Sequence, residues 1–267
     1  MSELTYTIID LADSSLNKAA VIIGGEQQAV VVDAGFTRAD GHRIVAALLD
    51  AGTQPTAVFV TAGDPDFYFG AEVIADAFPT VRFLAPADVA THIRETYAGK
   101  LDAWASLGAN LPTRLVTLED FEGDYDLEGH TLELRRIADG LGDRGWHLWD
   151  AQQRASVGGI LLFEGLHVWT ADTGTVEARA AWLAALDALE ALNPSYVVAG
   201  HRVAGSPTDL SAIDYTREYL RFFDKTIAES ADAAAAEKAL LAQYPDAGML
   251  VAVGLGTKVA TGELAWG

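Results

Sequence analysis

Three aspartates and one histidine in this chain follow runs of strand-like residues, and side chains of these types can transfer protons or hold a cation. They are Asp64, Asp66, Asp139 and His201. If the carboxylates lie close together with no cation between them, each disfavours the ionisation of the others, so at least one should have a raised pKa. Such a carboxyl group can act as a general acid or base near neutral pH. A neutral imidazole beside it can accept a proton, and an imidazolium can polarise a carbonyl group.

Asp64 and Asp66 lie in an unusual loop between a predicted strand at 57–60 and a predicted helix at 71–78. The loop reads Thr61-Ala62-Gly63-Asp64-Pro65-Asp66-Phe67-Tyr68-Phe69-Gly70. It resembles the zinc motif of the metallo-β-lactamase superfamily, T-H-x-H-x-D-H-x-x-G, and keeps its threonine, aspartate and glycine. Later segments resemble the small hydrolase-like members in order and spacing: Gly165–Trp169, Ala181–Leu186, Val198–His201 and Asp214–Leu220. The resemblance covers about residues 19–244 and implies a shared fold, but it is weaker evidence of activity.

The resemblance places the metal ligands of the family on positions that mostly carry other residues in this chain. The three histidines of the first zinc correspond to Ala62, Asp64 and Asp139. The ligands of the second zinc correspond to Asp66, Phe67 and His201, and the carboxylate that bridges both ions corresponds to Ile160. Ala62, Phe67 and Ile160 cannot coordinate a metal. A dinuclear zinc centre with a bridging hydroxide is therefore not expected.

The donors that remain form an acid-rich set. Three carboxylates and one imidazole suit Mg²⁺, Mn²⁺, Ca²⁺ or Fe²⁺ better than Zn²⁺, which prefers nitrogen and sulfur ligands. Two forms of the site stay open. Either one hard divalent ion binds to Asp64, Asp66, Asp139 and His201, or the same residues perform acid–base catalysis without a metal.

Four further residues are candidates for contact with a substrate. Phe67 and Ile160 would fill the space left by the missing metals, and Tyr68 and His167 could reach the pocket from neighbouring loops. Aromatic packing would also explain Tyr68, and a structural hydrogen bond would explain His167. Three other histidines are expected at the surface: His42, His92 and His130.

Two functions fit such a site. The first is an enzyme, a divergent hydrolase or lyase of the metallo-β-lactamase fold that acts on a small organic substrate. It is favoured because two of the replaced ligand positions carry aspartates rather than apolar residues. The alternative is a non-catalytic member that binds a small ligand or a protein partner, and the apolar replacements favour it. Zinc-dependent β-lactamase activity is not expected from either function. A third explanation, that the ligand residues were altered by design or mutation to inactivate the protein, would need many coordinated changes.

The composition narrows the range of partners. The formal net charge is −20, from 38 acidic and 18 basic residues, and this charge disfavours nucleic acids and anionic membranes. The chain has no cysteine and no Gly-x-Ser-x-Gly elbow, so covalent catalysis by cysteine or serine has little support. Without a signal-peptide or membrane-spanning pattern, we expect a cytoplasmic protein. A homodimer could form through the predicted helices at 177–192 or 210–242.

Strands and helices alternate along the chain, and they must position these loops. The pattern predicts a mixed α/β fold. The resemblance implies its architecture, a four-layer αββα sandwich of the metallo-β-lactamase type with extra C-terminal helices. We expect one domain over residues 1–267, with a helical extension over 208–243 packed on it. Two details are also predicted: a strand over 155–162, and helical structure over 210–242 with a soft, alanine-rich middle at 233–236.

Overall fold

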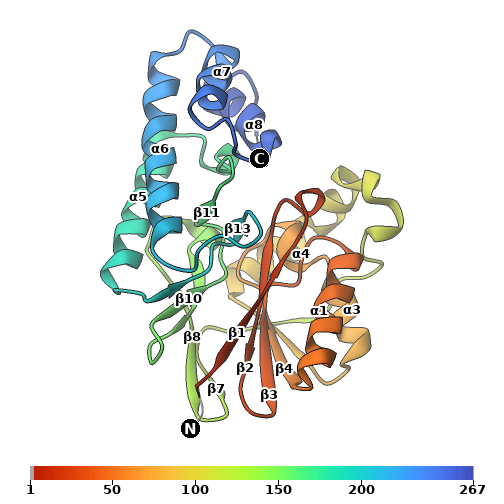
Figure 1. Cartoon of the computed structure of the whole chain (residues 1–267). Coiled ribbons are helices and arrows are strands. Elements are labelled where there is room, and N and C mark those ends of the chain that lie inside the picture. The colour runs from red at the N-terminus through yellow and green to blue at the C-terminus, as the bar shows by residue number, and fades with distance from the viewer. Residues whose placement is uncertain (1–2, 267) are drawn as a thin grey trace.

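Two β-sheets packed face to face form the centre of the protein (Figure 1). The computed structural model describes residues 3–266. The first sheet has the order β1 (Thr5–Asp10), β2 (Ala19–Gly24), β3 (Gln28–Val32), β4 (Gln54–Phe59), β5 (Arg82–Ala85) and β6 (Leu118–Asp120). The second has the order β12 (Tyr196–Val197), β10 (Ala155–Val157), β9 (Trp146–Asp150), β8 (His130–Arg136) and β7 (Gly123–Leu127). A short parallel pair joins β11 (Phe163–Glu164) to β13 (His201–Arg202).

Helices follow or connect the strands of both sheets. Within residues 3–266 they are α1 (Arg38–Ala51), α2 (Pro65–Tyr68), α3 (Ala71–Ala77), α4 (Ala87–Ala103), α5 (Val176–Ala191), α6 (Ser211–Glu229), α7 (Ala233–Gln243) and α8 (Leu250–Ala260). Figure 1 shows α1 and α3 beside the first sheet and α5 and α6 beside the second. α7 and α8 pack on each other at the end of the molecule where the chain terminates. This arrangement confirms the predicted αββα sandwich with extra C-terminal helices.

The strand directions in the first sheet bring several loops to one edge. β1, β2 and β3 pair antiparallel, whereas β3, β4, β5 and β6 run parallel. The carboxyl ends of parallel strands meet at the same edge of a sheet. The loop after β3, which starts at Asp33, therefore lies beside the loop after β4, which contains Asp64 and Asp66.

Two predicted elements are shorter than the sequence pattern indicates. The strand expected at 155–162 ends at Val157, because Gly158 and Gly159 adopt positive φ angles of 76° and 79° and turn the chain. The helix expected at 210–242 is divided: α6 ends at Glu229, and Asp232 caps the start of α7 through the backbone N–H of Ala235. α8 lies beyond the helical region that the sequence pattern predicts.

The helices give no indication of a membrane span. Within residues 3–266, none combines the length and the apolar character that a bilayer crossing requires.

Candidate active site

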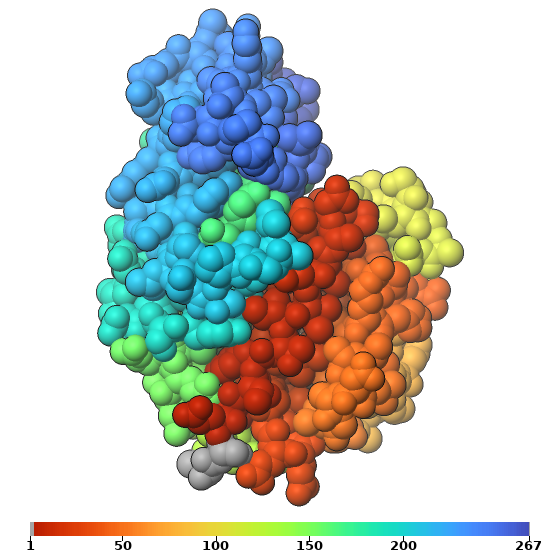
Figure 2. All heavy atoms as spheres, viewed as in Figure 1, coloured from red at the N-terminus to blue at the C-terminus, as the bar shows by residue number. Residues whose placement is uncertain are grey.

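A pocket with a volume of about 580 Å³ lies beside the loops that follow the parallel strands. Its apolar lining comes from Leu16, Ala103, Trp104, Ile160, Trp169, Met249 and Trp266. Its polar lining comes from Asp64, Asp66, His92, Thr96, Lys100, Asp143, Arg144, Asp172 and His201. Figure 2 shows a notch between the C-terminal helices and the yellow segment that follows α4, and lining residues come from both sides of it. A largely apolar cavity with a few convergent charged groups is typical of a small-molecule site.

A carboxylate–imidazole pair lies deep in this pocket. Oδ2 of Asp66, on α2, is 2.9 Å from Nε2 of His201, the first residue of β13, and both side chains are buried. The imidazole ring stacks on the ring of Phe163, with centroids 4.9 Å apart and planes 9° from parallel. The ring of Phe67 packs edge-on against it at 5.9 Å. The imidazole is thus held in one orientation toward the carboxylate.

The charge of Asp66 is stabilised by its neighbours. Burial raises the pKa of Asp66, but the hydrogen bond from His201 and the positive charges of His201 and Lys18 outweigh burial and hold this pKa below its ordinary value. Asp66 is therefore ionised at neutral pH. When the imidazole is neutral, its Nε2 donates to Asp66 and its Nδ1, which has no hydrogen-bond partner among the described residues, can accept a proton.

Lys18 places a fully buried ammonium group beside this pair. Its Nζ lies 2.8 Å from Oδ2 of Asp33 and 2.9 Å from the backbone oxygen of Ala19, and it sits 4.1 Å from the centroid of the Phe67 ring. Asp33 also accepts hydrogen bonds from the backbone and the hydroxyl of Thr61, at 3.0 and 2.7 Å. The sequence pattern does not reveal the role of Lys18, because its ammonium reaches the site from the start of the second strand.

Asp64 lies in a different electrostatic environment from Asp66, although only one residue separates them. Its Oδ2 is 3.2 Å from Nη1 of Arg144, which is also 3.0 Å from Oδ2 of Asp172. Removal from bulk water raises the pKa of Asp64; Arg144 opposes this shift, while the charges of Asp172 and Asp66 add to it. Two nearby carboxyl groups with pKa values shifted in opposite directions are the usual basis for separate acid and base roles.

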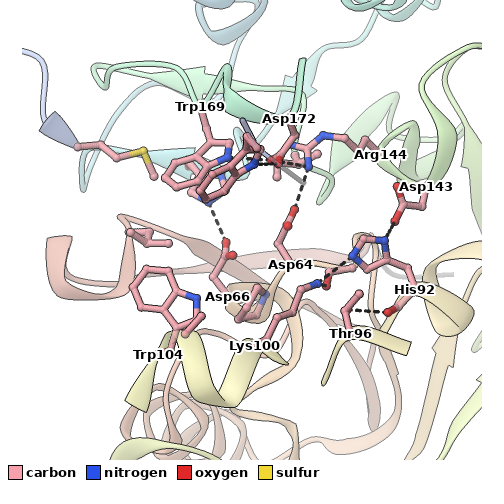
Figure 3. Close-up of a pocket in the computed structure, with 18 residues that line it drawn as sticks. Asp64, Asp66, His92, Thr96, Lys100, Trp104, Asp143, Arg144, Trp169 and Asp172 are labelled. Carbon is pink, nitrogen blue, oxygen red and sulfur yellow. Dashed lines mark hydrogen bonds and ion pairs between the residues drawn. The ribbon is translucent and has the colours of Figure 1, made fainter. Parts of the chain in front are cut away.

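One face of α4 supplies a second polar group. His92, Thr96 and Lys100 are spaced four residues apart and line the pocket together. Nζ of Lys100 is 3.0 Å from Nε2 of His92, and Nδ1 of His92 is 3.0 Å from Oδ2 of Asp143 (Figure 3). The expectation that His92 is a simple surface residue is therefore incomplete: its side chain is 41% exposed but lines the pocket. The four-residue spacing was the signal that could have identified it.

The structure brings together only part of the predicted site. Asp64, Asp66, His201 and Ile160 line the pocket. Asp139 does not: it is exposed in the bend after β8, before Gly140 turns the chain with a φ of 87°. The expected cluster of three aspartates is thus not assembled. The acid that this loop contributes to the pocket is Asp143, which lies beyond the turn.

The other residues expected to contact a substrate lie behind the pocket wall. Phe67 is fully buried under Lys18 and His201. Tyr68 is buried and packs against Phe69 and Tyr97. The side chain of His167 is also buried, with Nδ1 3.0 Å from the hydroxyl of Tyr219. Packing and structural hydrogen bonding account for the positions of these residues.

Comparison with known proteins identifies the family. The family model described as the metallo-beta-lactamase superfamily matches residues 16–201, so the chain belongs to this superfamily. A beta-lactamase domain protein from Burkholderia ambifaria has a similar structure, with a TM-score of 0.66 and 17% identity over 97% of this chain and 84% of that one. A metallo-beta-lactamase family protein from Thermus thermophilus has a TM-score of 0.65 and 16% identity over 97% and 93%. No curated protein matches the chain by sequence. At these identities, the structural similarities establish the fold alone.

The superfamily implies zinc, but the side chains of this pocket do not fit a zinc centre. Within residues 3–266, no group of three or more histidine, cysteine, aspartate or glutamate side chains is placed to hold a metal ion. Ala62, Phe67 and Ile160 provide no donor atoms where the resemblance places ligands. Asp66 and His201 use Oδ2 and Nε2 to bind each other, and the Lys18 ammonium lies against Phe67. A divalent cation at this point would face a fixed positive charge and too few ligands.

Proposed function

We propose that this protein is a hydrolase or lyase that acts on a small organic substrate by acid–base chemistry, without a dinuclear zinc centre. The Asp66–His201 pair accepts a proton, and Asp64 donates one. The observation that carries the proposal is the different surroundings of two carboxylates in one pocket: Asp66 is bonded to His201, whereas Asp64 lies beside Arg144. These surroundings shift the pKa of Asp66 downward and that of Asp64 upward. Acid and base roles that are separated in this way serve both the hydrolysis of an activated acyl group and an elimination.

The lining of the pocket supports a substrate with an apolar body. Trp104 and Trp169 face the acidic residues across the cavity in Figure 3, and Trp266 packs edge-on against Trp169 at 6.1 Å. The indole nitrogens of Trp169 and Trp266 both donate to Asp172, at 2.8 and 2.6 Å. The aromatic wall is therefore held in place by the same carboxylate that binds Arg144.

Turnover of a substrate panel by matched variants tests the proposal. The panel contains esters, thioesters, lactones and substrates for β-elimination. Asp66→Asn keeps the size of the side chain but removes its charge, and it should lower turnover by about 100- to 10,000-fold. Asp139→Asn is the control, because Asp139 lies outside the pocket, and it should retain full turnover. Full turnover by Asp66→Asn would refute the proposal.

The apolar wall also favours a second function, binding without catalysis. In that case, compounds from the same panel would raise the melting temperature while no product forms. The wild-type protein would then behave like Asp66→Asn in the turnover assay, and the melting shift would disappear only when the tryptophans are replaced.

A further inference from the structure

A chain of three polar side chains runs along the pocket wall, separate from the Asp66–His201 pair. It passes from Asp143 through His92 to Lys100, with both contacts at 3.0 Å. Figure 3 shows the imidazole between the carboxylate and the ammonium. The three residues come from α4 and from the short helix Gly142–Arg144, and all of them line the cavity.

The partners of His92 determine which of its nitrogens carries the proton. A lysine ammonium can only donate, so Nε2 accepts the hydrogen bond from Lys100. Nδ1 then carries the hydrogen that is donated to Asp143. This is the order of a catalytic triad, in which a carboxylate orients an imidazole and the imidazole takes a proton from a nucleophile.

Lys100 differs from the other cations of the site in lacking a carboxylate partner. Within residues 3–266, no carboxylate oxygen lies within 4.0 Å of its Nζ, whereas Lys18 pairs with Asp33 and Arg144 pairs with Asp64. Its other hydrogen bond goes to the backbone oxygen of Gly63. Burial lowers the pKa of Lys100, and the charges of Asp64, Asp143, Asp66 and Asp172 reverse part of this shift. The uncharged amine is therefore a larger fraction of Lys100 at a given pH than of an exposed lysine.

The chain from Asp143 through His92 to Lys100 is called the relay below. The loop at Gly63 lies beside it and leaves space for the imidazole of His92. A Cβ atom at Gly63 would lie 2.8 Å from Cδ2 of His92 and 3.3 Å from Oδ2 of Asp143. Any side chain at this position would displace the ring. The glycine between the substituted ligand positions 62 and 64 thus fits the relay closely.

We propose that Lys100 is a nucleophilic amine that forms an imine with an aldehyde or ketone bound in this pocket. His92 first takes a proton from the ammonium, and Asp143 stabilises the resulting imidazolium. The nitrogen lone pair attacks the carbonyl carbon, and the C=O π electrons move to the oxygen, which takes that proton from His92. His92 then takes a second proton from the nitrogen and passes it to the hydroxyl group of the carbinolamine. The hydroxyl group leaves as water while the nitrogen lone pair forms the C=N bond, so that Lys100 ends as a protonated imine and His92 is neutral again. No oxidant or other co-reactant is needed.

The proposal depends on the pocket and not on proton transfer by Asp66 and His201. It concerns a different nucleophile and can be tested without turnover. An imine withdraws electrons from the neighbouring carbon, so it would favour the removal of a proton or the cleavage of a bond at that carbon. Carbonyl compounds with an apolar body suit the tryptophan wall.

Reductive trapping tests the proposal on the full chain. The protein is incubated at neutral pH with phenylacetaldehyde and sodium cyanoborohydride, and labelled lysines are located by peptide mass spectrometry. Exposed Lys225, Lys238 and Lys258 serve as internal references. Lys100 should be labelled first and singly, because ordinary lysines are protonated at this pH. Labelling of Lys100 at the rate of the exposed lysines would overturn the proposal.

Variants separate a relay from a purely structural contact. Lys100→Arg keeps the charge and should abolish the fast label, whereas His92→Gln should slow it by roughly 100-fold while Lys225 reacts unchanged. Melting temperatures confirm that both variants fold, and Asp143→Asn provides a second test of the relay if His92→Gln is unstable. An unchanged labelling rate in both His92→Gln and Asp143→Asn would refute the relay. Asp66→Asn should still be labelled, so failure of the proposed function and failure of this inference give different results.

Discussion

Nε2 of His201 lies 2.9 Å from Oδ2 of Asp66, and this buried contact joins two segments that are 135 residues apart in the chain. Asp66 lies on α2, which follows β4 of the first sheet, and His201 begins β13, which pairs with β11. The contact therefore does more than define an acid–base pair: it connects distant parts of the chain across the site. The protonation states of Asp66 and His201 should affect the stability of the fold as well as any reaction in the pocket.

The contribution of Asp66 to stability should disappear in acid. Burial raises its pKa, but His201 and Lys18 hold it below the ordinary value. A carboxyl group with a lowered folded-state pKa stabilises the fold fully above its unfolded pKa, about 3.9, and the contribution is lost as the pH falls through the folded pKa. Urea unfolding from pH 7 downward should show wild type more stable than Asp66→Asn, with a difference that shrinks below about pH 4. A difference independent of pH would contradict this expectation.

Asp64→Asn should increase the stability of the protein at neutral pH, whereas Asp66→Asn should decrease it. Burial is the main reason that the pKa of Asp64 is raised, and Asp172 and Asp66 add to the shift against the opposition of Arg144. A raised folded-state pKa means that the ionised carboxylate destabilises the fold, so stability is lost as the pH rises from the unfolded pKa through the folded one. Asp64→Asn removes that cost, while its amide oxygen can still accept from Arg144. Its melting temperature at pH 7 should exceed that of wild type, and the gain should vanish below the unfolded pKa.

Turnover provides the control for this stability gain. If Asp64 is the acid of the proposed reaction, the variant should be more stable and less active. A variant that is both less stable and fully active would show that the carboxylate is a structural partner of Arg144 only.

Removing the buried ammonium of Lys18 should destabilise the protein strongly. Lys18 and Asp33 are both fully buried and lie 2.8 Å apart. Lys18→Met would leave Asp33 as an uncompensated buried charge, and loss of one partner of such a pair costs about 3–5 kcal/mol. The free energy of unfolding from chemical denaturation measures the loss.

A double variant checks the origin of that loss. Lys18→Met with Asp33→Asn removes both charges, and the asparagine oxygen can still accept hydrogen bonds from Thr61. It should be more stable than Lys18→Met alone. If the double variant loses the sum of both single effects, the pair is not coupled and the electrostatic interpretation of Lys18 is wrong.

Local sequence patterns predict individual elements, and the resemblance supplies their arrangement in layers. The helices expected at 71–78 and 177–192 correspond to α3 and α5, whose ends lie within about two residues of these bounds. The break between α6 and α7 was missed because alanine-rich sequence around it favours helix on both sides. The cap at Asp232 is a local signal that could have located it.

The charge pattern of the site was less predictable, because it depends on contacts between distant segments. Asp66 and His201 were found from the resemblance, and the structure places them in contact. Arg144 lines the pocket and Lys18 lies buried behind it against Phe67, and both come from segments with no chemical motif, so composition and spacing could not reveal them. The resemblance assigns a ligand position to Asp139 across a loop, and only a few residues separate it from Asp143, which does line the pocket.

Removal of metal should leave the protein unchanged. Asp66 and His201 already satisfy each other, Lys18 supplies a positive charge beside them, and the described residues provide no third carboxylate or imidazole donor in reach. A metal present at 100 times its dissociation constant would stabilise the fold by about 2.7 kcal/mol. We therefore expect the melting temperature to be the same before and after dialysis against a chelator, and after addition of Zn²⁺, Mg²⁺, Mn²⁺, Ca²⁺ or Fe²⁺. Elemental analysis of the purified protein should find metal far below one ion per chain. Stoichiometric zinc with a lower melting temperature after chelation would show that the side chains rearrange around an ion, and the assignment of Lys18 as the local positive charge would then be wrong.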